Sequence, residues 1–385
     1  MRNKKNQDPK SEFIKMLKKI IADRIKQEGP ISFRDFMEMA LYYPGYGYYT
    51  AADTEIGCRG DFYTSSHVHP VFGALVGKQI AEMWEVMGKP DGFHVIEMGA
   101  GRGYLASDML AYLKGTDFFK ALTYVIVEIN PYIKKKQEQL LAGYMDKMQW
   151  ASSLEEIKFV PGCVLSNELL DAFPVHLIYT NSGKINEIYV SIERDDFGEV
   201  YRECSPGILN YLSEFGITLP QDYRTEVNLD IIKWLKDVET TLREGFIITI
   251  DYGYPAAEYY SMSRRSGTLV CYHKHQVSDN PYQHIGQQDI SAHVNFSAVK
   301  KWGEEFGFES VGFASQGTFL VSLRIDEVLQ EKYAEEDNHE PGRNTVSKLI
   351  SPEGLGESHK ILIQYKGKLK QKLSGYSLRN RLNLL

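Results

Sequence analysis

The stretch that decides the fold is Val95-Ile96-Glu97-Met98-Gly99-Ala100-Gly101-Arg102-Gly103-Tyr104-Leu105. It starts as a short apolar strand, passes through a glycine-rich turn and enters a helix. The helix is indicated by apolar residues at helical spacing: Leu105, Met109, Leu110 and Leu113. Glycines at such a joint let the backbone approach a ligand, and the first turn of the helix offers unpaired N–H groups to it. The stretch therefore predicts a βα unit with a ligand at its joint.

The spacing of the glycines indicates which ligand binds. A dinucleotide site has the pattern G-x-G-x-x-G, but Tyr104 stands where its last glycine belongs. Glu97 precedes Gly99 by two residues, and an acid there suits a cationic amino group better than a diphosphate. S-adenosylmethionine carries such a group, so we predict that Glu97, Gly99, Gly101 and Gly103 bind it. The alternative is a chance glycine turn in an ordinary αβ unit.

A second apolar strand, residues 122–129, ends near Glu128. Continuous apolar strands are typical of parallel sheets that are buried on both faces. In nucleotide sites an acid at the end of the second strand accepts hydrogen bonds from ribose hydroxyls. Glu128 alone could be a solvated strand end, but with the glycine turn it indicates a cofactor site, to which we also assign Ile129.

Strands and helices alternate through most of the chain, as a doubly wound sheet requires, so we predict an α/β fold. The expected strands are residues 93–97, 123–128, 163–166, 246–251, 308–314 and 359–366. Residues 1–90 form N-terminal helices and cofactor-covering loops, 91–330 the core, and 331–385 an acidic linker, a last strand and a basic tail. Residues 175–202 alternate apolar and polar side chains, so we expect a β insertion near 175–225.

Two carboxylates follow the third expected strand, in Ser166-Asn167-Glu168-Leu169-Leu170-Asp171-Ala172-Phe173-Pro174. If they open a helix, Glu168 and Asp171 project on one face. Paired carboxylates suit a guanidinium, which has five donors and is held bidentately. An enzyme for amines of DNA bases would instead show (Asp/Asn/Ser)-Pro-Pro-(Tyr/Phe) here. The alternative is structural, with Asn167 capping the helix and the acids stabilising its dipole.

A polar loop at residues 286–296 contains Asp289 and His293, which could orient a substrate amine. A single loop histidine is more often structural. The pair His273 and His275 and the pair His67 and His69 each lack a third ligand, so we expect no metal site.

Composition limits the other options. The chain has 385 residues, a net charge of −7 and 43% hydrophobic residues, enough for a sizeable core. It has no run of eighteen apolar residues and no secretory signal pattern, so we expect no membrane span. Its four cysteines are scattered without C-x-x-C pairs, which favours a cytoplasmic location. Residues 358–385 hold seven Lys or Arg and no acid, and we expect a solvated end rather than a nucleic-acid site.

Several motifs, in order along the chain, resemble the MidA-like family of class I S-adenosylmethionine-dependent methyltransferases, whose mitochondrial members are complex I assembly factors. The motifs are YYPGYGYYT (42–50), GDFYTSSHVHPVFG (60–73), VIEMGAGRG (95–103), SNELLDAFPV (166–175), TIDYG (249–253), GTLVCY (267–272), DISAHVNF (289–296), QGTFLVSL (316–323) and LISPEGLGESHKIL (349–362). The chain departs from the family at Ser66-His67, where Pro-Glu is usual, so no acidic role is carried over there.

The resemblance implies a Rossmann-like core with the cofactor at Gly99 to Gly103 and Glu128. To the cofactor site we add Asn167 and three residues of the GDFYTSS segment: Asp61, Tyr63 and Thr64. Eukaryotic relatives are linked to symmetric dimethylation of an arginine in a complex I subunit. We therefore predict a protein arginine N-methyltransferase that acts on a partner protein, with Glu168, Asp171, Asp289 and His293 as catalytic residues. The alternatives are a cofactor-binding assembly chaperone, or a methyltransferase for RNA or a small molecule. A homodimer stays open.

The tyrosine-rich loop at residues 42–49 is too aromatic for a plain surface connection. We predict that it and residues 60–65 cover the cofactor as a lid, with Gly45 and Gly47 allowing a tight fold. The alternative is that the tyrosines pack the N-terminal helices.

Overall fold

The computed structural model describes residues 9–52, 65–194, 196–334, 340–368 and 372–385. Contacts divide the chain into two compact units, which we describe separately. The first unit comprises Met1–Phe62, Ala172–Asp230 and Tyr260–Ala292; the second comprises Tyr63–Asp171, Ile231–Tyr259 and His293–Leu385. The three segments predicted from the sequence, with bounds at residues 90 and 330, stay a prediction.

The second unit contains an eight-stranded sheet in the order β15-β16-β10-β5-β2-β3-β4, with β14 beside β10. Its strands are β2 (Phe93–Met98), β3 (Leu122–Val127), β4 (Met148–Ala151), β5 (Val160–Asn167), β10 (Leu242–Tyr254), β14 (Val294–Asn295), β15 (Glu309–Ser315) and β16 (His359–Lys366). All six strands expected from the sequence are present, and the α/β class is confirmed.

The strands from β10 to β4 are parallel, whereas β16 runs antiparallel to both β10 and β15. From β2 the chain builds the sheet outward through β3 and β4, and then returns to the other side of β2 with β5 and β10. The order therefore reverses between β2 and β5. In open α/β sheets, ligands bind beyond the carboxyl ends of the strands at this reversal.

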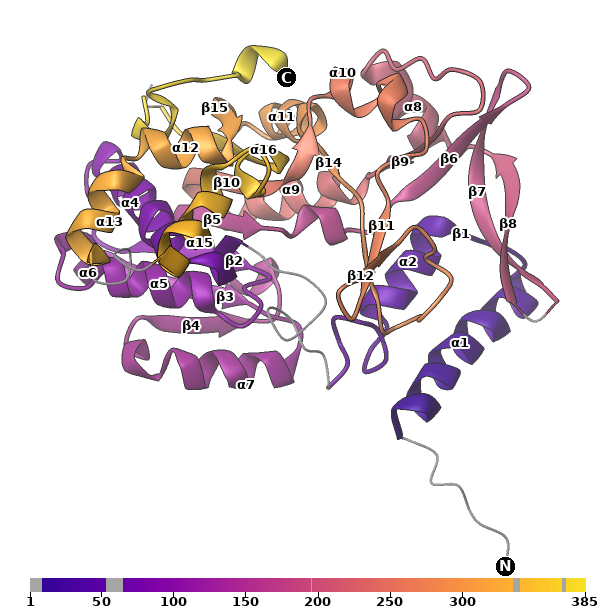
Figure 1. Ribbon diagram of the computed structural model, residues 1–385, viewed down its shortest axis with the longest axis horizontal. Coiled ribbons are helices and arrows are strands. Elements are labelled where there is room, and N and C mark those ends of the chain that lie inside the picture. The colour runs from indigo at the N-terminus through magenta and orange to yellow at the C-terminus, as the bar shows by residue number, and fades with distance from the viewer. Residues whose placement is uncertain (1–8, 53–64, 195, 335–339, 369–371) are drawn as a thin grey trace, which may run out of the picture. The chain divides into compact units, whose positions relative to one another are not determined.

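Helices surround this sheet (Figure 1). They are α3 (Ser65–Val68), α4 (Val71–Val86), α5 (Tyr104–Leu113), α6 (Asp117–Ala121), α7 (Pro131–Leu140), α9 (Asp230–Thr241), α10 (Ala256–Tyr259), α11 (Phe296–Glu305), α12 (Gln316–Ser322), α13 (Ile325–Lys332), α15 (Glu340–Ile350) and α16 (Leu355–Ser358). Some of them contact its strands, such as α11 on β15, and others pack on neighbouring helices, such as α13 on α4. Short 3-10 turns lie at η1 (Ala142–Tyr144), η2 (Leu154–Glu156), η3 (Leu170–Ala172), η5 (Ser374–Tyr376) and η6 (Leu382–Leu384). The apolar positions predicted for α5 are all buried, so that helix covers the core as expected.

The first unit is built on two antiparallel sheets. One joins β1 (Ile31–Ser32), β7 (Lys184–Glu193), β6 (His176–Asn181) and β9 (Arg224–Val227), with β8 (Asp196–Glu203) beside β7. The other joins β12 (Gln276–Ser278), β11 (Val270–His273) and β13 (Asp289–Ser291). The helices are α1 (Pro9–Glu28), α2 (Phe33–Tyr42) and α8 (Pro206–Glu214), with a 3-10 turn η4 (Met262–Arg264). Residues 175–202 thus form antiparallel hairpins.

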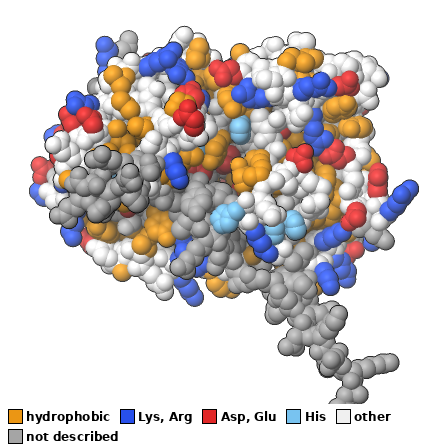
Figure 2. All heavy atoms as spheres, viewed as in Figure 1, with side chains coloured by type: hydrophobic (Ala, Val, Ile, Leu, Met, Phe, Trp, Pro, Cys, Tyr) orange, Lys and Arg blue, Asp and Glu red, His pale blue; other side chains and the backbone are white. Residues whose placement is uncertain are grey.

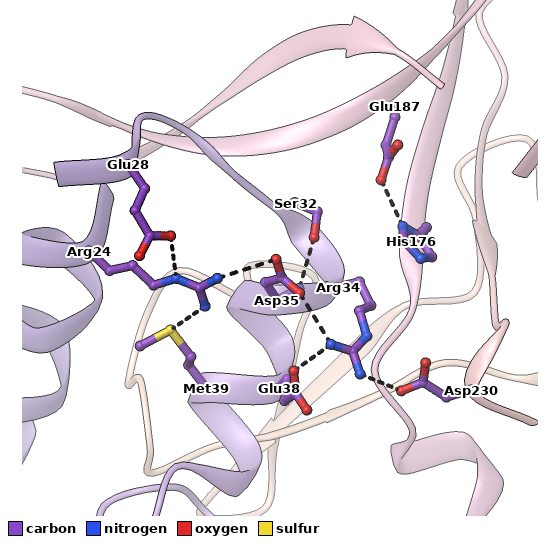
Figure 3. A network of polar contacts seen from close by, with 10 residues as sticks. All are labelled: Arg24, Glu28, Ser32, Arg34, Asp35, Glu38, Met39, His176, Glu187 and Asp230. Atoms are coloured by element: carbon purple, nitrogen blue, oxygen red, sulfur yellow. Dashed lines mark hydrogen bonds and ion pairs between the residues drawn. The ribbon is translucent and has the colours of Figure 1, made fainter. Parts of the chain in front are cut away.

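A polar network fastens the start of α2 within this unit (Figure 3). Ser32 caps the helix by accepting a hydrogen bond from the Asp35 N–H at 3.1 Å. Arg34 pairs with Glu38 on the same helix and with Asp230 at 2.8 Å, so it ties α2 to a segment distant in sequence. Such caps and pairs set the helix position more than they add to stability.

The tyrosine-rich loop packs into the core of the first unit. Tyr48 is buried, the Tyr42 hydroxyl donates to the Ala172 carbonyl at 3.0 Å, and the Tyr42 and Tyr49 rings stack with centroids 5.5 Å apart. A Cβ on Gly47 would lie 2.6 Å from the Leu41 carbonyl oxygen, so the close turn requires glycine. These contacts favour the packing alternative for residues 42–49; residues 60–64 lie outside the described part of the chain.

The basic C-terminal segment is not a simple solvated end. Tyr376 is buried and its hydroxyl donates to the Ile361 carbonyl at 3.2 Å. The Arg381 N–H donates to the Phe313 carbonyl at 2.7 Å, so the segment covers the edge of β15. The Lys372 and Arg379 side chains are nevertheless exposed, so the segment is anchored by Tyr376 while these basic groups face solvent as expected.

Among the described residues, no helix is long and apolar enough to cross a membrane, and no cluster of three or more His, Cys, Asp or Glu side chains could hold a metal ion. On the face shown in Figure 2, basic and acidic side chains are interspersed.

Candidate active site

The glycine turn lies directly after β2. Gly99, Gly101 and Gly103 have φ angles of 67°, 53° and 87°, a region that residues with side chains rarely adopt. Gly103 is the N-cap of α5, and no described side chain caps this helix. The positive end of the α5 dipole lies at this turn and suits an anionic group of a ligand.

A buried glutamine connects this turn to the end of β3. The Gln137 side-chain amide, fully buried on α7, donates to the Gly101 carbonyl at 2.8 Å and to Glu128 Oε2 at 3.0 Å. Its own oxygen accepts a hydrogen bond from Trp150 Nε1 at 3.0 Å, which fixes the amide orientation. Gln137 was not among the predicted site residues, because a single glutamine on a polar helix has no distinguishing sequence pattern.

Glu128 is held in place from a second side by the Asn130 N–H, which donates to Oε1 at 2.8 Å. Burial raises the pKa of this carboxyl, while the hydrogen bonds from Asn130 and Gln137 act in the opposite direction. The next residue, Ile129, is 53% exposed, although it is a large apolar side chain. An oriented carboxylate beside an exposed apolar surface suits a ribose joined to an adenine ring.

Glu97 lies deeper than a ligand-facing acid would. It is 2% exposed and accepts a hydrogen bond from the Tyr124 hydroxyl at 2.7 Å. Burial raises the pKa of its carboxyl to about 7. Its direct contact with the cofactor amino group stays a prediction.

Taken together, these groups fit S-adenosylmethionine. Three left-handed glycines allow close approach, the uncapped start of α5 suits the carboxylate of the methionine end, and the fixed Glu128 carboxylate suits ribose hydroxyls. Asp61, Tyr63 and Thr64 lie outside the described residues, so their assignment stays a prediction.

The loop after β5 differs from the predicted helix. Glu168 has a φ of 52°, and the only helical turn that follows is the three-residue η3. The physical reason is Asp251 at the end of β10, whose Oδ2 accepts hydrogen bonds from the N–H groups of Leu169, Leu170 and Asp171 at 3.2, 2.9 and 3.4 Å. Glu168 and Asp171 therefore do not share one face of a helix, and Asn167 caps none.

This loop lies beside the glycine turn. Strand β5 pairs with β2 in the register Met98 to Ser166, and a Cβ on Gly99 would come within 3.0 Å of Leu169 Cδ1. The residues after β5 thus lie at the same edge of the sheet as the proposed cofactor contacts. The structure brings Asn167 and Glu168 to the place that the sequence predicted.

Glu168 is a buried carboxylate with one engaged oxygen and one unengaged. Its side chain is 3% exposed, and Oε1 lies 3.3 Å from both the Ser65 nitrogen and His359 Nε2. Oε2 has no hydrogen-bond partner among the described residues, and neither has the buried Asn167 Oδ1. Buried acceptors without a donor are costly, so a ligand that brings donors would be favoured here.

A second acid is coupled to this group. Asp251 is fully buried, and burial together with the nearby Glu168 charge raises the pKa of its carboxyl to about 8, against the effect of the backbone N–H groups. Asp171 is also buried and follows in the same loop. Asp251 organises the loop through the backbone N–H groups, so it is a positioning residue. The sequence predicted its place at the edge of the sheet but not this role.

His359, which lies 3.3 Å from Glu168, belongs to a group of neighbouring histidine and tyrosine rings. The Tyr252 ring packs against His359 with centroids 4.0 Å apart and lies 6.1 Å from the His293 ring, which is also 5.3 Å from Tyr254. His293 is thus in the same unit as Glu168. His359 was not predicted as a site residue, although it lies in one of the quoted family motifs.

Asp289 belongs to the first unit and has partners there. Its Oδ1 accepts from the Tyr49 hydroxyl at 2.7 Å and its Oδ2 from Ser291 Oγ at 2.9 Å. It fastens the tyrosine-rich loop to β13, and its catalytic role stays a prediction.

Comparison with known proteins identifies the chemistry. Residues 75–314 match the family described as "Putative S-adenosyl-L-methionine-dependent methyltransferase". A crystal structure of a Burkholderia thailandensis protein, described as a "likely methyl transferase" and bound to S-adenosyl-homocysteine, is 29% identical with a TM-score of 0.89, over 99% of this chain and all of that one.

Curated relatives cover most of the chain as well. The mitochondrial protein arginine methyltransferase NDUFAF7 homolog of Drosophila melanogaster is 28% identical over 94% of this chain and 87% of its own length. Human mitochondrial NDUFAF7 is 27% identical over 87% of this chain and 80% of its own length. The glycine turn, the acid after β3 and these matches agree: the chain belongs to this family of methyltransferases and uses S-adenosylmethionine as its cofactor.

Proposed function

We propose that the methyl acceptor is an arginine guanidinium of a partner protein, bound by Glu168 with Asp171 as the second carboxylate. The observation that carries the proposal is the pair of buried acceptor atoms, Glu168 Oε2 and Asn167 Oδ1, that lack donors among the described residues. The names of the curated relatives, which are protein arginine methyltransferases, support the same acceptor.

A guanidinium matches these acceptors in charge and in number of donors. It carries five N–H donors in a planar fork and stays protonated. It can therefore donate hydrogen bonds to Glu168 Oε2 and Asn167 Oδ1 at once and neutralise the charge of Glu168. A neutral base amine would leave the buried carboxylate without a counter-charge. Binding also fixes the attacking nitrogen beside the glycine turn, and such positioning supplies much of the catalysis in a displacement reaction.

The bound cofactor supplies an electrophilic methyl group, and its transfer forms a nitrogen–carbon bond, breaks the carbon–sulfur bond and releases one proton from the nitrogen. Glu168 is the group that would accept that proton and orient the remaining lone pair. His293 would order the far side of the acceptor through the aromatic contacts with Tyr252 and Tyr254. Asp289 keeps its predicted role on the acceptor side.

The test uses Glu168→Gln and Asp171→Asn, with the exposed Glu155→Gln of the same unit as control. The substrate is the extracted proteome of source cells that lack the gene, incubated with labelled S-adenosylmethionine and analysed by mass spectrometry. We expect methylarginine with the wild type and the control. Both site variants should lose about 100-fold or more of the rate, as for removal of a group that stabilises developing charge. Calorimetry should give cofactor affinities within about threefold of wild type.

Label on residues other than arginine, or on RNA, would refute the acceptor. Loss of cofactor binding together with transfer would assign the two carboxylates a structural role. Equal cofactor binding without any turnover, in wild type and variants alike, would favour the assembly-chaperone alternative.

The location and assembly of the protein stay proposals. We infer a reducing compartment, as for the cytoplasm, because Cys163, Cys204 and Cys271 are free thiols and two of them are buried. The curated relatives named above are mitochondrial. A homodimer is compatible with this reading, and light scattering of the purified protein would measure it.

A further inference from the structure

We propose that His359 is a positioning residue for the methyl acceptor: its Nε2–H holds Glu168 Oε1, so that Oε2 is presented to the acceptor. The proposal rests on the proposed function for the identity of that acceptor. The role of His359 can nevertheless be measured separately.

The fold brings this histidine to the site from the far end of the chain. His359 is the first residue of β16, which runs antiparallel to β10 with His359 opposite Tyr252. Its side chain is fully buried, and Nε2 lies 3.3 Å from Glu168 Oε1. A fully buried histidine beside a carboxylate with 3% exposure is a pair that solvent screens little.

The other ring nitrogen contacts a serine hydroxyl. Ser358 Oγ lies 3.2 Å from His359 Nδ1 and 3.4 Å from the Leu355 carbonyl oxygen, so its one proton has two acceptors within reach. In the proposed arrangement the hydroxyl donates to Nδ1, because the ring proton is then on Nε2 and points to Glu168. The Tyr252 ring, 4.0 Å away between centroids, packs against the imidazole and limits its rotation.

The two carboxylate oxygens of Glu168 have different surroundings. Oε1 accepts a hydrogen bond from the Ser65 N–H, and His359 Nε2 lies 3.3 Å from Oε1 without a hydrogen bond in this structure, while Oε2 has no partner among the described residues. The 3.3 Å separation exceeds the about 2.7–2.9 Å of a tight charge-assisted hydrogen bond. Hydrogen bonds at catalytic sites commonly shorten in the substrate complex, and we expect this one to do so.

The charged and titratable groups around the pair come from several elements. Glu168 follows β5, Asp251 and Tyr252 lie on β10, and the His293 ring lies 6.1 Å from the Tyr252 ring that packs against His359. Lys360, next along β16, bonds to the Glu357 carbonyl instead. His359 is therefore the side chain that lies against Glu168 Oε1, beside the Ser65 N–H, while Asp251 adds negative charge nearby.

The test compares two replacements that differ in one property. His359→Gln keeps an N–H donor at a similar reach, and His359→Phe keeps a planar ring against Tyr252 but removes the donor. With a methylatable arginine substrate, His359→Phe should lower kcat about 100-fold, while His359→Gln should recover activity to within about tenfold of wild type. Cofactor affinity should stay within about threefold in both. Equal kcat in His359→Phe and wild type would overturn the proposal while leaving arginine methylation intact.

If no methylated arginine is found, the proposed function is refuted but the role of His359 is not. A second measurement, made without substrate, therefore tests the pair of His359 and Glu168 directly. Nitrogen-15 resonances of the His359 ring are compared between wild type and Glu168→Gln, with the ring labelled selectively. We expect the Nε2 resonance to shift when the carboxylate becomes an amide, with the protein still folded. An unchanged resonance would show that the pair does not exist in solution and would overturn the role of His359.

Discussion

Replacing Gln137 with Leu tests how the cofactor site is held together. Leu has a similar volume but no polar group, so the change separates the Gly101 carbonyl, Glu128 Oε2 and Trp150 Nε1 from their common partner. A buried polar group left without a partner costs about 1–3 kcal/mol. Because Gly101, Glu128 and Trp150 are only partly buried, water compensates in part, and we expect the free energy of unfolding to fall by about 2–4 kcal/mol.

We expect the substitution of Gln137 to weaken cofactor binding as well, because Glu128 loses one of the hydrogen bonds that orient it. If the loss of orientation costs about 1.5–3 kcal/mol of binding, the Kd for S-adenosylmethionine rises about 10- to 100-fold. Titration calorimetry at a temperature where the variant is folded measures this Kd. Gln139→Leu is the matched control, because it makes the same substitution at an exposed position of the same helix, α7. Wild-type affinity in a folded Gln137→Leu protein would refute the idea that this amide couples the glycine turn to the ribose-binding acid.

Two other perturbations test buried polar groups. The folded state holds a proton on Glu97 up to a pKa of about 7, whereas the unfolded chain releases it near 4.5, so wild type loses about 3 kcal/mol of stability as the pH rises between these values. Glu97→Gln should remove this loss, so the difference between its thermal midpoint and that of wild type should increase from pH 5 to pH 8. If the thermal midpoints of the two proteins change in parallel with pH, the raised pKa of Glu97 is contradicted. In hydrogen exchange, residues 42–51 should be protected without cofactor and unchanged by it, because the tyrosines pack in their own unit; new protection on cofactor binding would restore the lid hypothesis.

The sequence predicted the strand, turn and helix around the glycines, because that segment is local. A strand, three glycines and a helix follow one another within a few residues, and each residue type has a direct conformational reason at its position. The six strands could be found in the same way, since strands buried on both faces are continuous apolar runs; β16 contains one as well, although it lies antiparallel to its neighbours. Gln137 was missed because its function depends on contacts with Gly101 and Trp150, neither of which is adjacent in sequence.

The acceptor half was predicted only by residue type. The segment after β5 has good helix formers, and the local pattern favoured a helix from Glu168 onward. A carboxylate on β10 binds three successive N–H groups of that segment instead, and this tertiary interaction overrides the propensity. The same limit applies to His359, whose partner Glu168 is reached only because β16 enters the sheet antiparallel to β10.

The electrostatics of the acceptor half also bear on the choice between an enzyme and an assembly chaperone. Glu168 and Asp251 are two buried acids close enough that the charge of one raises the pKa of the other, and one oxygen of Glu168 has no donor among the described residues. Such an arrangement destabilises the fold, because buried like charges and unpaired acceptors both carry a cost. A protein that only bound the cofactor would be more stable with an amide or apolar residue in place of Glu168, whereas Asp251 has a structural use for its carboxylate in the loop after β5. The Glu168 carboxylate is explained if a cationic acceptor binds there, since the charge and the donors of that acceptor remove both costs in the complex that leads to methyl transfer.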